Sequence, residues 1–134
     1  MSDSDAFRPA GTHLLADFHG IAADKLTGAA QIDALLRAGA EAAGARILHS
    51  HFHSFGEQLG ITGVVLLAES HISIHTWPEY GFAAADIFMC GKAQPELALQ
   101  VIDKAFGASS RVVRTIARGA HVAPVPQPVL TKAG

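Results

Sequence analysis

The sequence predicts an α+β fold, a two-layer sandwich in which an antiparallel sheet carries two helices on one face. Short segments of alternating apolar residues follow one another across short turns, which is typical of hairpins and therefore of antiparallel strands. Two further segments show apolar residues at helical spacing, and each lies between predicted strands. The length of 134 residues suits a single domain, residues 1–134, with one modest core.

The first half of the chain predicts strands around one helix. Residues 12–20 alternate as a strand, and residues 31–43 have the apolar spacing of a helix that Gly44 ends. A second strand is expected over residues 45–55. Residues 61–75 (ITGVVLLAES and HISIH) are strand material because they are rich in β-branched side chains.

The second half repeats this order. Residues 76–81 (TWPEYG) contain a proline and a glycine and predict a turn, and residues 82–90 return as a strand. Pro95 begins a second helix at a favoured position. Residues 109–117 form a last strand, and the proline-containing tail, residues 119–134, is expected to be mobile or extended.

Two helices cover only one face of such a sheet, so the other face needs a partner. Hydrophobic residues make up 49% of the chain and charged residues only 16%. The sequence therefore predicts a homodimer that associates through the open face of the sheet or through its edge.

Charge and composition argue against several classes of protein. The net charge of −2 gives no electrostatic attraction to nucleic acid. The longest purely apolar run, residues 64–68, is too short to cross a membrane. The acidic, polar start (MSDSDAFRPAG) is unlike a secretory signal, and the single cysteine, Cys90, cannot form an internal disulfide. We expect a cytoplasmic protein that binds neither nucleic acid nor membranes.

Chemically unusual residues gather in the predicted hairpin around the TWPEYG turn. If that turn centres near Tyr80, Cys90 lies opposite Ser70 and Ala85 lies opposite His75, so the lone cysteine and Ser70 are close neighbours. Alternation places Ser70 and His75 on different faces. The chain must therefore bend, bulge or break near residue 70 if the two side chains are to meet.

Common catalytic motifs are absent from the sequence. It has no phosphate-binding Gly-Lys-Ser/Thr loop, no HExxH, no paired CxxC and no G-x-S-x-G elbow around Ser70. Taken singly, Cys90 would be a small buried hydrophobe, His75 a structural histidine and Glu79 a solvated turn residue.

The stretch AESHISIHTWPEYGFAAADIFMCG changes this interpretation, because it closely resembles the self-processing segment of the small bacterial and archaeal S-adenosylmethionine decarboxylases. GTHLLADF, HFHSF and GVVLLAES agree with the same family, and the resemblance covers nearly all of residues 11–117. It implies a pyruvoyl group made from the chain itself. Cleavage between Glu69 and Ser70 would give one chain of residues 1–69 and another, residues 70–134, that begins with the pyruvoyl group.

The resemblance also implies a role for each residue of the segment. The Ser70 hydroxyl attacks the Glu69 carbonyl, and His75 removes the Ser70 α-proton during processing. Thr62 assists by hydrogen bonding, at a place where the family often has serine. The pyruvoyl group then forms a Schiff base with the substrate amine and takes up electrons as the carboxylate leaves. Cys90 protonates the decarboxylated product.

Three further residues are implied to bind the substrate. Phe55 matches an aromatic residue that stacks on adenine, and Glu79 matches the acid that accepts hydrogen bonds from the ribose hydroxyls. Trp77 packs near the pocket, where a flat aromatic ring suits a sulfonium cation. The implied activity is decarboxylation of S-adenosylmethionine, which supplies the aminopropyl donor for spermidine biosynthesis. An arginine or ornithine decarboxylase on the same scaffold is the alternative; Phe55 and Glu79 favour the nucleoside.

A row of histidines supports an alternative of another class. His49, His51 and His53 share one face of a predicted strand, and their imidazoles could ligate zinc, copper or nickel in a non-catalytic metal- or ligand-binding module. No carboxylate or cysteine obviously completes such a site. We therefore favour a polar row on a half-solvated strand or at a subunit contact, and expect no metal.

Overall fold

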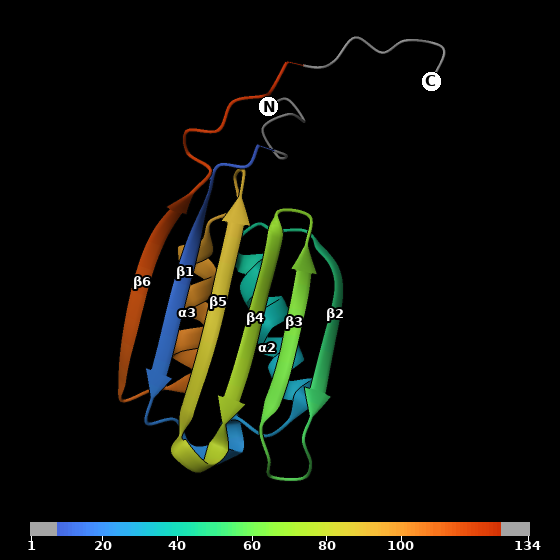
Figure 1. The fold of residues 1–134 in the computed structure, drawn as a ribbon. Coiled ribbons are helices and arrows are strands. Elements are labelled where there is room, and N and C mark those ends of the chain that lie inside the picture. Colours follow the sequence, from blue (N-terminus) through green and yellow to red (C-terminus); the bar gives the residue numbers. More distant parts are fainter. Residues whose placement is uncertain (1–7, 127–134) are drawn as a thin grey trace.

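In a computed structural model, which describes residues 8–126, the chain folds as two layers (Figure 1). One layer is a six-stranded sheet in which all neighbouring strands are antiparallel. The other layer consists of two α-helices, which lie on the same face of the sheet (Figure 1). The predicted α+β sandwich is confirmed.

Every predicted strand and helix is present, with bounds that differ from the expected ones by a few residues. The strand order in the sheet is β2-β3-β4-β5-β1-β6. In chain order the elements are β1 (Gly11–His19), the 3-10 helix η1 (Ala23–Lys25), α2 (Ala29–Ala42), β2 (Ile47–Ser54), β3 (Ile61–Leu67), β4 (Ser70–Trp77), the 3-10 helix η2 (Pro78–Tyr80), β5 (Phe82–Cys90), α3 (Pro95–Phe106) and β6 (Ser110–Arg118).

The core lies between the sheet and the two helices. Strand alternation sends every second side chain toward the helices, and the apolar stripes of α2 and α3 meet them. The buried side chains include Leu14, Ala16, Phe18, Ile32, Leu36, Ile72, Ile74, Ile87, Ile102 and Phe106. Burial of this kind contributes about 25 cal/mol for each Å² of apolar surface removed from water.

The segment predicted as strand material over residues 61–75 is a hairpin. Leu67 pairs with Ser70, so Ala68 and Glu69 form a two-residue turn between β3 and β4. Tight turns of this length usually have a positive φ at a central residue, where glycine or asparagine is favoured. Here neither Ala68 nor Glu69 has a positive φ, and the positive φ falls on Ser70, the residue after the turn, at 156°. The two turn residues are neither glycine, asparagine nor proline, so residue type does not predict a tight hairpin turn at this point.

The β4–β5 hairpin is one residue out of the predicted register. Its closing pair is Trp77 and Phe82, and the left-handed Gly81 (φ 59°) ends the turn. The turn is therefore centred half a residue before Tyr80, and every pair shifts by one. The observed pairs are Ser70 with Met89 and His75 with Ala84, in place of Ser70 with Cys90 and His75 with Ala85.

No helix within residues 8–126 is long and apolar enough to cross a membrane. Residues 119–126 follow β6 and are mostly exposed. Residues 127–134 of the predicted tail lie outside the described residues, so mobility of that tail stays a prediction.

Candidate functional site

The Glu69–Ser70 peptide bond lies in the turn between β3 and β4, at one end of the sheet (Figure 1). The φ of 156° at Ser70 is a backbone conformation that residues with a side chain rarely adopt, and it costs on the order of 1–3 kcal/mol. The backbone N–H of Cys90 donates a hydrogen bond to the carbonyl oxygen of Glu69, at 3.1 Å. A donor in this position polarises the carbonyl of the strained peptide bond.

The side chains of Ser70 and Cys90 are neighbours, as expected, although the register differs. Ser70 Oγ and Cys90 Sγ are 3.6 Å apart. Met89 pairs with Ser70 across the strands, but its side chain is buried in the core. The φ at Ser70 breaks the alternation of β4 and accounts for the contact of its hydroxyl with Cys90 instead.

The first strand leaves room for the Cys90 thiol. Gly11 pairs with Cys90, and a Cβ at Gly11 would lie 2.7 Å from the Sγ atom. The carbonyl oxygen of Pro9 lies 3.8 Å from the same sulfur. The thiol is therefore enclosed by Ser70 on one side and by the start of β1 on the other.

A pocket of about 380 Å³ lies at the opposite end of the sheet. It brings together five residues that the sequence singled out: Phe55, Thr62, His75, Trp77 and Glu79. Its remaining lining residues, Leu59, Gly60 and Thr76, were not predicted. The sequence carried no specific signal for Gly60, whose added Cβ would collide with the Thr76 carbonyl oxygen.

His75 is held by neighbours on two strands. Thr62 pairs with His75 across β3 and β4, and Thr62 Oγ1 lies 3.1 Å from His75 Nδ1. The rings of His75 and Trp77 have centroids 6.1 Å apart on the same face of β4. At the end of the next strand, β2, the rings of His53 and Phe55 meet edge to face with centroids 4.7 Å apart. The pocket thus combines an oriented imidazole with aromatic surfaces.

Thr76 lines this pocket and is held by two hydrogen bonds of its side chain. It is buried, and its hydroxyl donates to the Leu26 carbonyl oxygen at 2.8 Å while accepting from the Ile61 N–H at 2.9 Å. One side chain therefore ties β4 to β3 and to the segment after η1. These bonds fix the strand that carries both His75 and Trp77.

The structure does not bring Ser70 and His75 together within one chain. β4 is continuous from Ser70 to Trp77, and a strand rises about 3.3 Å per residue, so the two Cα atoms are about 16 Å apart. The bend predicted near residue 70 is the turn at Ala68 and Glu69, before β4 begins. This turn does not shorten the distance between Ser70 and His75. Thr62 is paired with His75 and is equally far from the Glu69–Ser70 bond.

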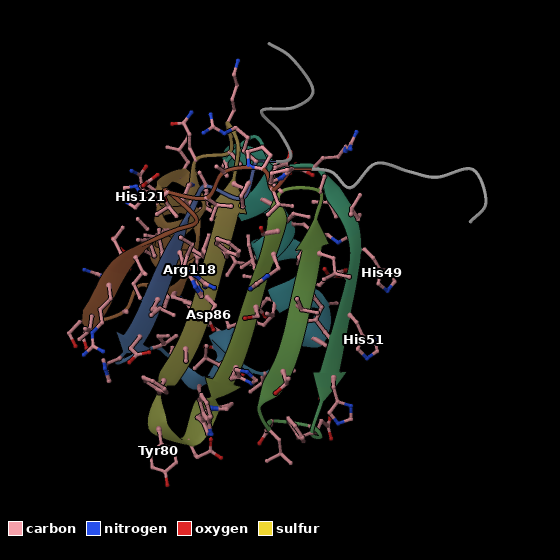
Figure 2. The ribbon with its side chains drawn as sticks, turned by 45° about the horizontal axis from the view of Figure 1, so that its top comes forward. His49, His51, Tyr80, Asp86, Arg118 and His121 are labelled. Carbon is pink, nitrogen blue, oxygen red and sulfur yellow. The ribbon has the colours of Figure 1, made fainter. Side chains whose placement is uncertain are left out.

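A polar cluster that sequence reasoning missed lies in the middle of the open face, where Figure 2 labels Asp86 and Arg118. Arg118 Nη1 donates to His13 Nδ1 at 3.3 Å, so the proton of the neutral imidazole sits on Nε2, which is 3.2 Å from Asp86 Oδ1. Ser73 Oγ donates to the other Asp86 oxygen at 3.4 Å. Burial lowers the pKa of the adjacent His71; His13 adds to this effect and Asp86 opposes it.

The histidine row lies on β2, at the edge of the sheet. His49, His51 and His53 pair with Leu66, Val64 and Thr62, so they do share one face, and all three are exposed. Figure 2 shows His49 and His51 projecting away from the sheet edge. Within residues 8–126 no group of three or more histidine, cysteine or acidic side chains is close enough to hold a metal ion. The geometry gives no support to the metal-binding alternative.

Comparison with known proteins identifies the family. The sequence pattern described as S-adenosylmethionine decarboxylase matches residues 12–119. The chain is 42% identical, over 79% of its length and 72% of the relative, to the S-adenosylmethionine decarboxylase proenzyme of Sulfurihydrogenibium sp.. It is 51% identical to the proenzyme of Persephonella marina, over 60% of each chain.

A solved structure agrees with these relatives. The crystal structure of the adenosylmethionine decarboxylase from Aquifex aeolicus superposes with a TM-score of 0.77 at 36% sequence identity, and the match covers 90% of this chain and 99% of that one. The chain therefore belongs to the S-adenosylmethionine decarboxylase family.

Proposed function

We propose that this chain cleaves itself between Glu69 and Ser70 and then, with the resulting pyruvoyl group, decarboxylates S-adenosylmethionine. One observation carries the proposal: the bond lies in a tight turn, strained at Ser70, with its carbonyl oxygen bound by the Cys90 N–H. Membership of the family and relatives named as proenzymes support it. The product is the aminopropyl donor for spermidine biosynthesis.

The residues at the turn fit the formation of a pyruvoyl group. The Ser70 oxygen attacks the Glu69 carbonyl carbon; the C–N bond breaks and a C–O bond forms, so the amide becomes an ester. Removal of the Ser70 α-proton then expels the Glu69 carboxylate and leaves dehydroalanine. Addition of water and loss of ammonia leave the pyruvoyl group. The Cys90 N–H stabilises the oxyanion that develops on Glu69 in the first step.

His75 is the proposed base for the α-proton. When its Nδ1–H donates to the Thr62 oxygen, its Nε2 is free to accept a proton. Cys90 is the proposed proton donor to the product because its thiol lies beside Ser70. The pyruvoyl group itself supplies an electrophilic carbonyl that accepts electrons as the carboxylate leaves.

The pocket is the proposed half-site for the nucleoside. Phe55 and Trp77 offer aromatic faces for adenine and for the sulfonium charge, and Glu79 offers a carboxylate for the ribose hydroxyls. Decarboxylation of arginine or ornithine is not favoured, since neither substrate has a ring to stack or a ribose to bind.

Formation of a complete site requires a second copy of the chain. Each copy carries Ser70 and Cys90 at one end of the sheet and the His75 pocket at the other. We propose a homodimer in which two open faces meet about a twofold axis that runs perpendicular to β4. Facing sheets pack about 10 Å apart, so the Ser70 end of one β4 meets the His75 end of the other, and two identical sites form.

The open face has the surface that such a dimer would cover. Its exposed apolar side chains are Leu66, Trp77, Val112 and Ile116, which come from strands at both sides of the sheet. The polar cluster around Asp86 lies between them, near the proposed axis.

Intact-mass spectrometry tests the proposal before any substrate is chosen. Purified protein should give two chains, residues 1–69 and 70–134, with a ketone in place of the amine at the start of the second. A Ser70→Ala variant should stay whole and inactive. Carbon dioxide release should follow addition of S-adenosylmethionine and not of arginine or ornithine. A chain that remains uncut yet fully active would refute the proposal.

A further inference from the structure

Arg46 lies in the short connection between α2 and β2, and its backbone binds the scissile turn from the β3 side. Its N–H donates to Glu69 Oε1 at 3.0 Å. Its carbonyl oxygen accepts from the N–H of Ala68 at 2.8 Å. The backbone N–H and C=O of Arg46 thus bind the two turn residues, Glu69 and Ala68 respectively. These contacts extend the hydrogen bonding of the sheet one step beyond the last ladder pair.

Glu69 is held from the other side as well. Its main-chain oxygen accepts the Cys90 N–H from β5, whereas its side-chain oxygen accepts the Arg46 N–H. Two anchors on opposite sides leave its peptide plane little freedom to rotate. A strained φ such as that of Ser70 persists only where surrounding contacts prevent relaxation, and these are such contacts.

The Glu69 carboxylate makes this contact without a charged partner. The ion pairs formed within residues 8–126 join His13 to Asp86, Arg37 to Asp33 and Arg111 to Asp103. Glu69 instead binds a backbone N–H, a charge-assisted hydrogen bond that is stronger than one between neutral groups. The partner of the Glu69 carboxylate is a main-chain N–H, which every residue except proline has. The residue type at position 46 therefore does not predict this contact.

We infer that the Glu69 side chain is a positioning residue for self-cleavage, acting through the Arg46 backbone to hold the strained turn. This role is separate from that of the Glu69 carbonyl, which the Ser70 hydroxyl attacks. The inference rests on the proposed self-cleavage. Without the side-chain anchor, the turn relaxes, Ser70 Oγ spends less time near the carbonyl carbon, and cleavage slows.

The test compares cleavage rates of freshly synthesised protein by intact mass over time. Glu69→Gln keeps an oxygen acceptor and should cleave within about threefold of the wild-type rate, whereas Glu69→Ala should be slower by about tenfold or more, as loss of a hydrogen bond to a charged group implies. Glu41→Ala makes the same change at an exposed position on α2 and should cleave at the wild-type rate. Rescue by glutamine separates an anchoring role from a general loss of stability.

Equal rates for Glu69→Ala and wild type would overturn the inference while leaving self-cleavage intact. A glutamine variant as slow as the alanine variant would also overturn it, because the amide oxygen can accept the same bond. Failure of the wild type itself to cleave would instead refute the proposed function.

A second variant tests the donor. Arg46→Pro removes the N–H that Glu69 accepts, so it should slow cleavage, and combination with Glu69→Ala should slow it no further. Additive losses would contradict the inference. Thermal melting of Arg46→Pro establishes that it folds; if it does not, the glutamine and alanine variants at Glu69 still decide.

Discussion

Cys90 contributes two separate groups to the turn at Glu69 and Ser70, its backbone N–H and its thiol. The N–H binds the Glu69 carbonyl oxygen, which is the proposed target of the Ser70 hydroxyl, and the thiol lies 3.6 Å from that hydroxyl. Any residue other than proline keeps the first group, but only cysteine supplies the second. Self-cleavage and turnover should therefore respond differently to a change at this position.

Cys90→Ala should still cleave between Glu69 and Ser70, because the N–H remains. Its decarboxylation rate should fall by about 10² to 10⁴, the usual contribution of a positioned proton donor. Intact mass measures the cleavage, and carbon dioxide release per cleaved chain measures the turnover. Full activity would remove the thiol from the mechanism.

His71 should make stability depend on pH. Burial lowers its pKa below 6.5 in the folded chain, so as the pH falls through 6.5 the unfolded chain takes up a proton that the folded chain does not. The free energy of unfolding should therefore decrease below pH 6.5. The decrease should be smaller in His71→Gln. Urea unfolding of both proteins at pH 7.5 and pH 5.5 checks this, and equal losses would contradict it.

At the scale of the elements, β4 connects the two ends of the sheet. Its first residue carries the predicted cleavage chemistry, and its last three line the pocket. Thr76 fixes the pocket end through hydrogen bonds to β3 and to the segment after η1. One buried hydroxyl therefore joins three parts of the chain at the pocket end of β4.

Thr76→Val should lower the free energy of unfolding by about 1–3 kcal/mol, because it leaves the Leu26 carbonyl and the Ile61 N–H without their partner in the core. The matched control is Thr115→Val on the exposed strand β6. This variant should change the free energy of unfolding by less than about 0.5 kcal/mol. Urea denaturation measures both. Equal effects in the two variants would show that the Thr76 hydroxyl has no special role.

At the scale of the whole molecule, the separation of Ser70 from His75 is the feature that most constrains the mechanism. A distance of about 16 Å along one strand cannot be closed by side-chain movement. Either His75 has no part in processing, or it acts on the Ser70 of a second copy. In the twofold dimer proposed above, His75 of each copy lies near Ser70 of the other copy, so both sites are completed in the same way.

Mixing two inactive variants should restore cleavage if each site uses both copies. Ser70→Ala and His75→Ala should each stay uncut alone. In mixed dimers the His75→Ala chain still has Ser70 and meets an intact His75, so random pairing should cleave about half of the His75→Ala chains and none of the Ser70→Ala chains. Intact mass distinguishes the two. Mixed dimers in which no chain is cleaved would exclude a shared site.

Local patterns in the sequence predict the helices and strands and most of the residue types at the site. Alternation and helical spacing are local properties, so they placed β5 at 82–90 and began α3 at Pro95, as the structure has them. The family resemblance predicted Phe55, Trp77 and Glu79 as substrate-binding residues and Thr62 and His75 as processing residues, and all five line the pocket. A motif depends only on the order of residues along the chain, so it could single them out.

Which of these residues come into contact depends on the three-dimensional fold. The turn at Ala68–Glu69, the one-residue shift between β4 and β5, and the anchors from Arg46 and Cys90 all depend on how strands pair across the sheet. The polar cluster around Asp86 likewise joins strands far apart in sequence. Pairing and turn geometry are set by contacts between distant segments, and a local pattern of residue types does not carry that information.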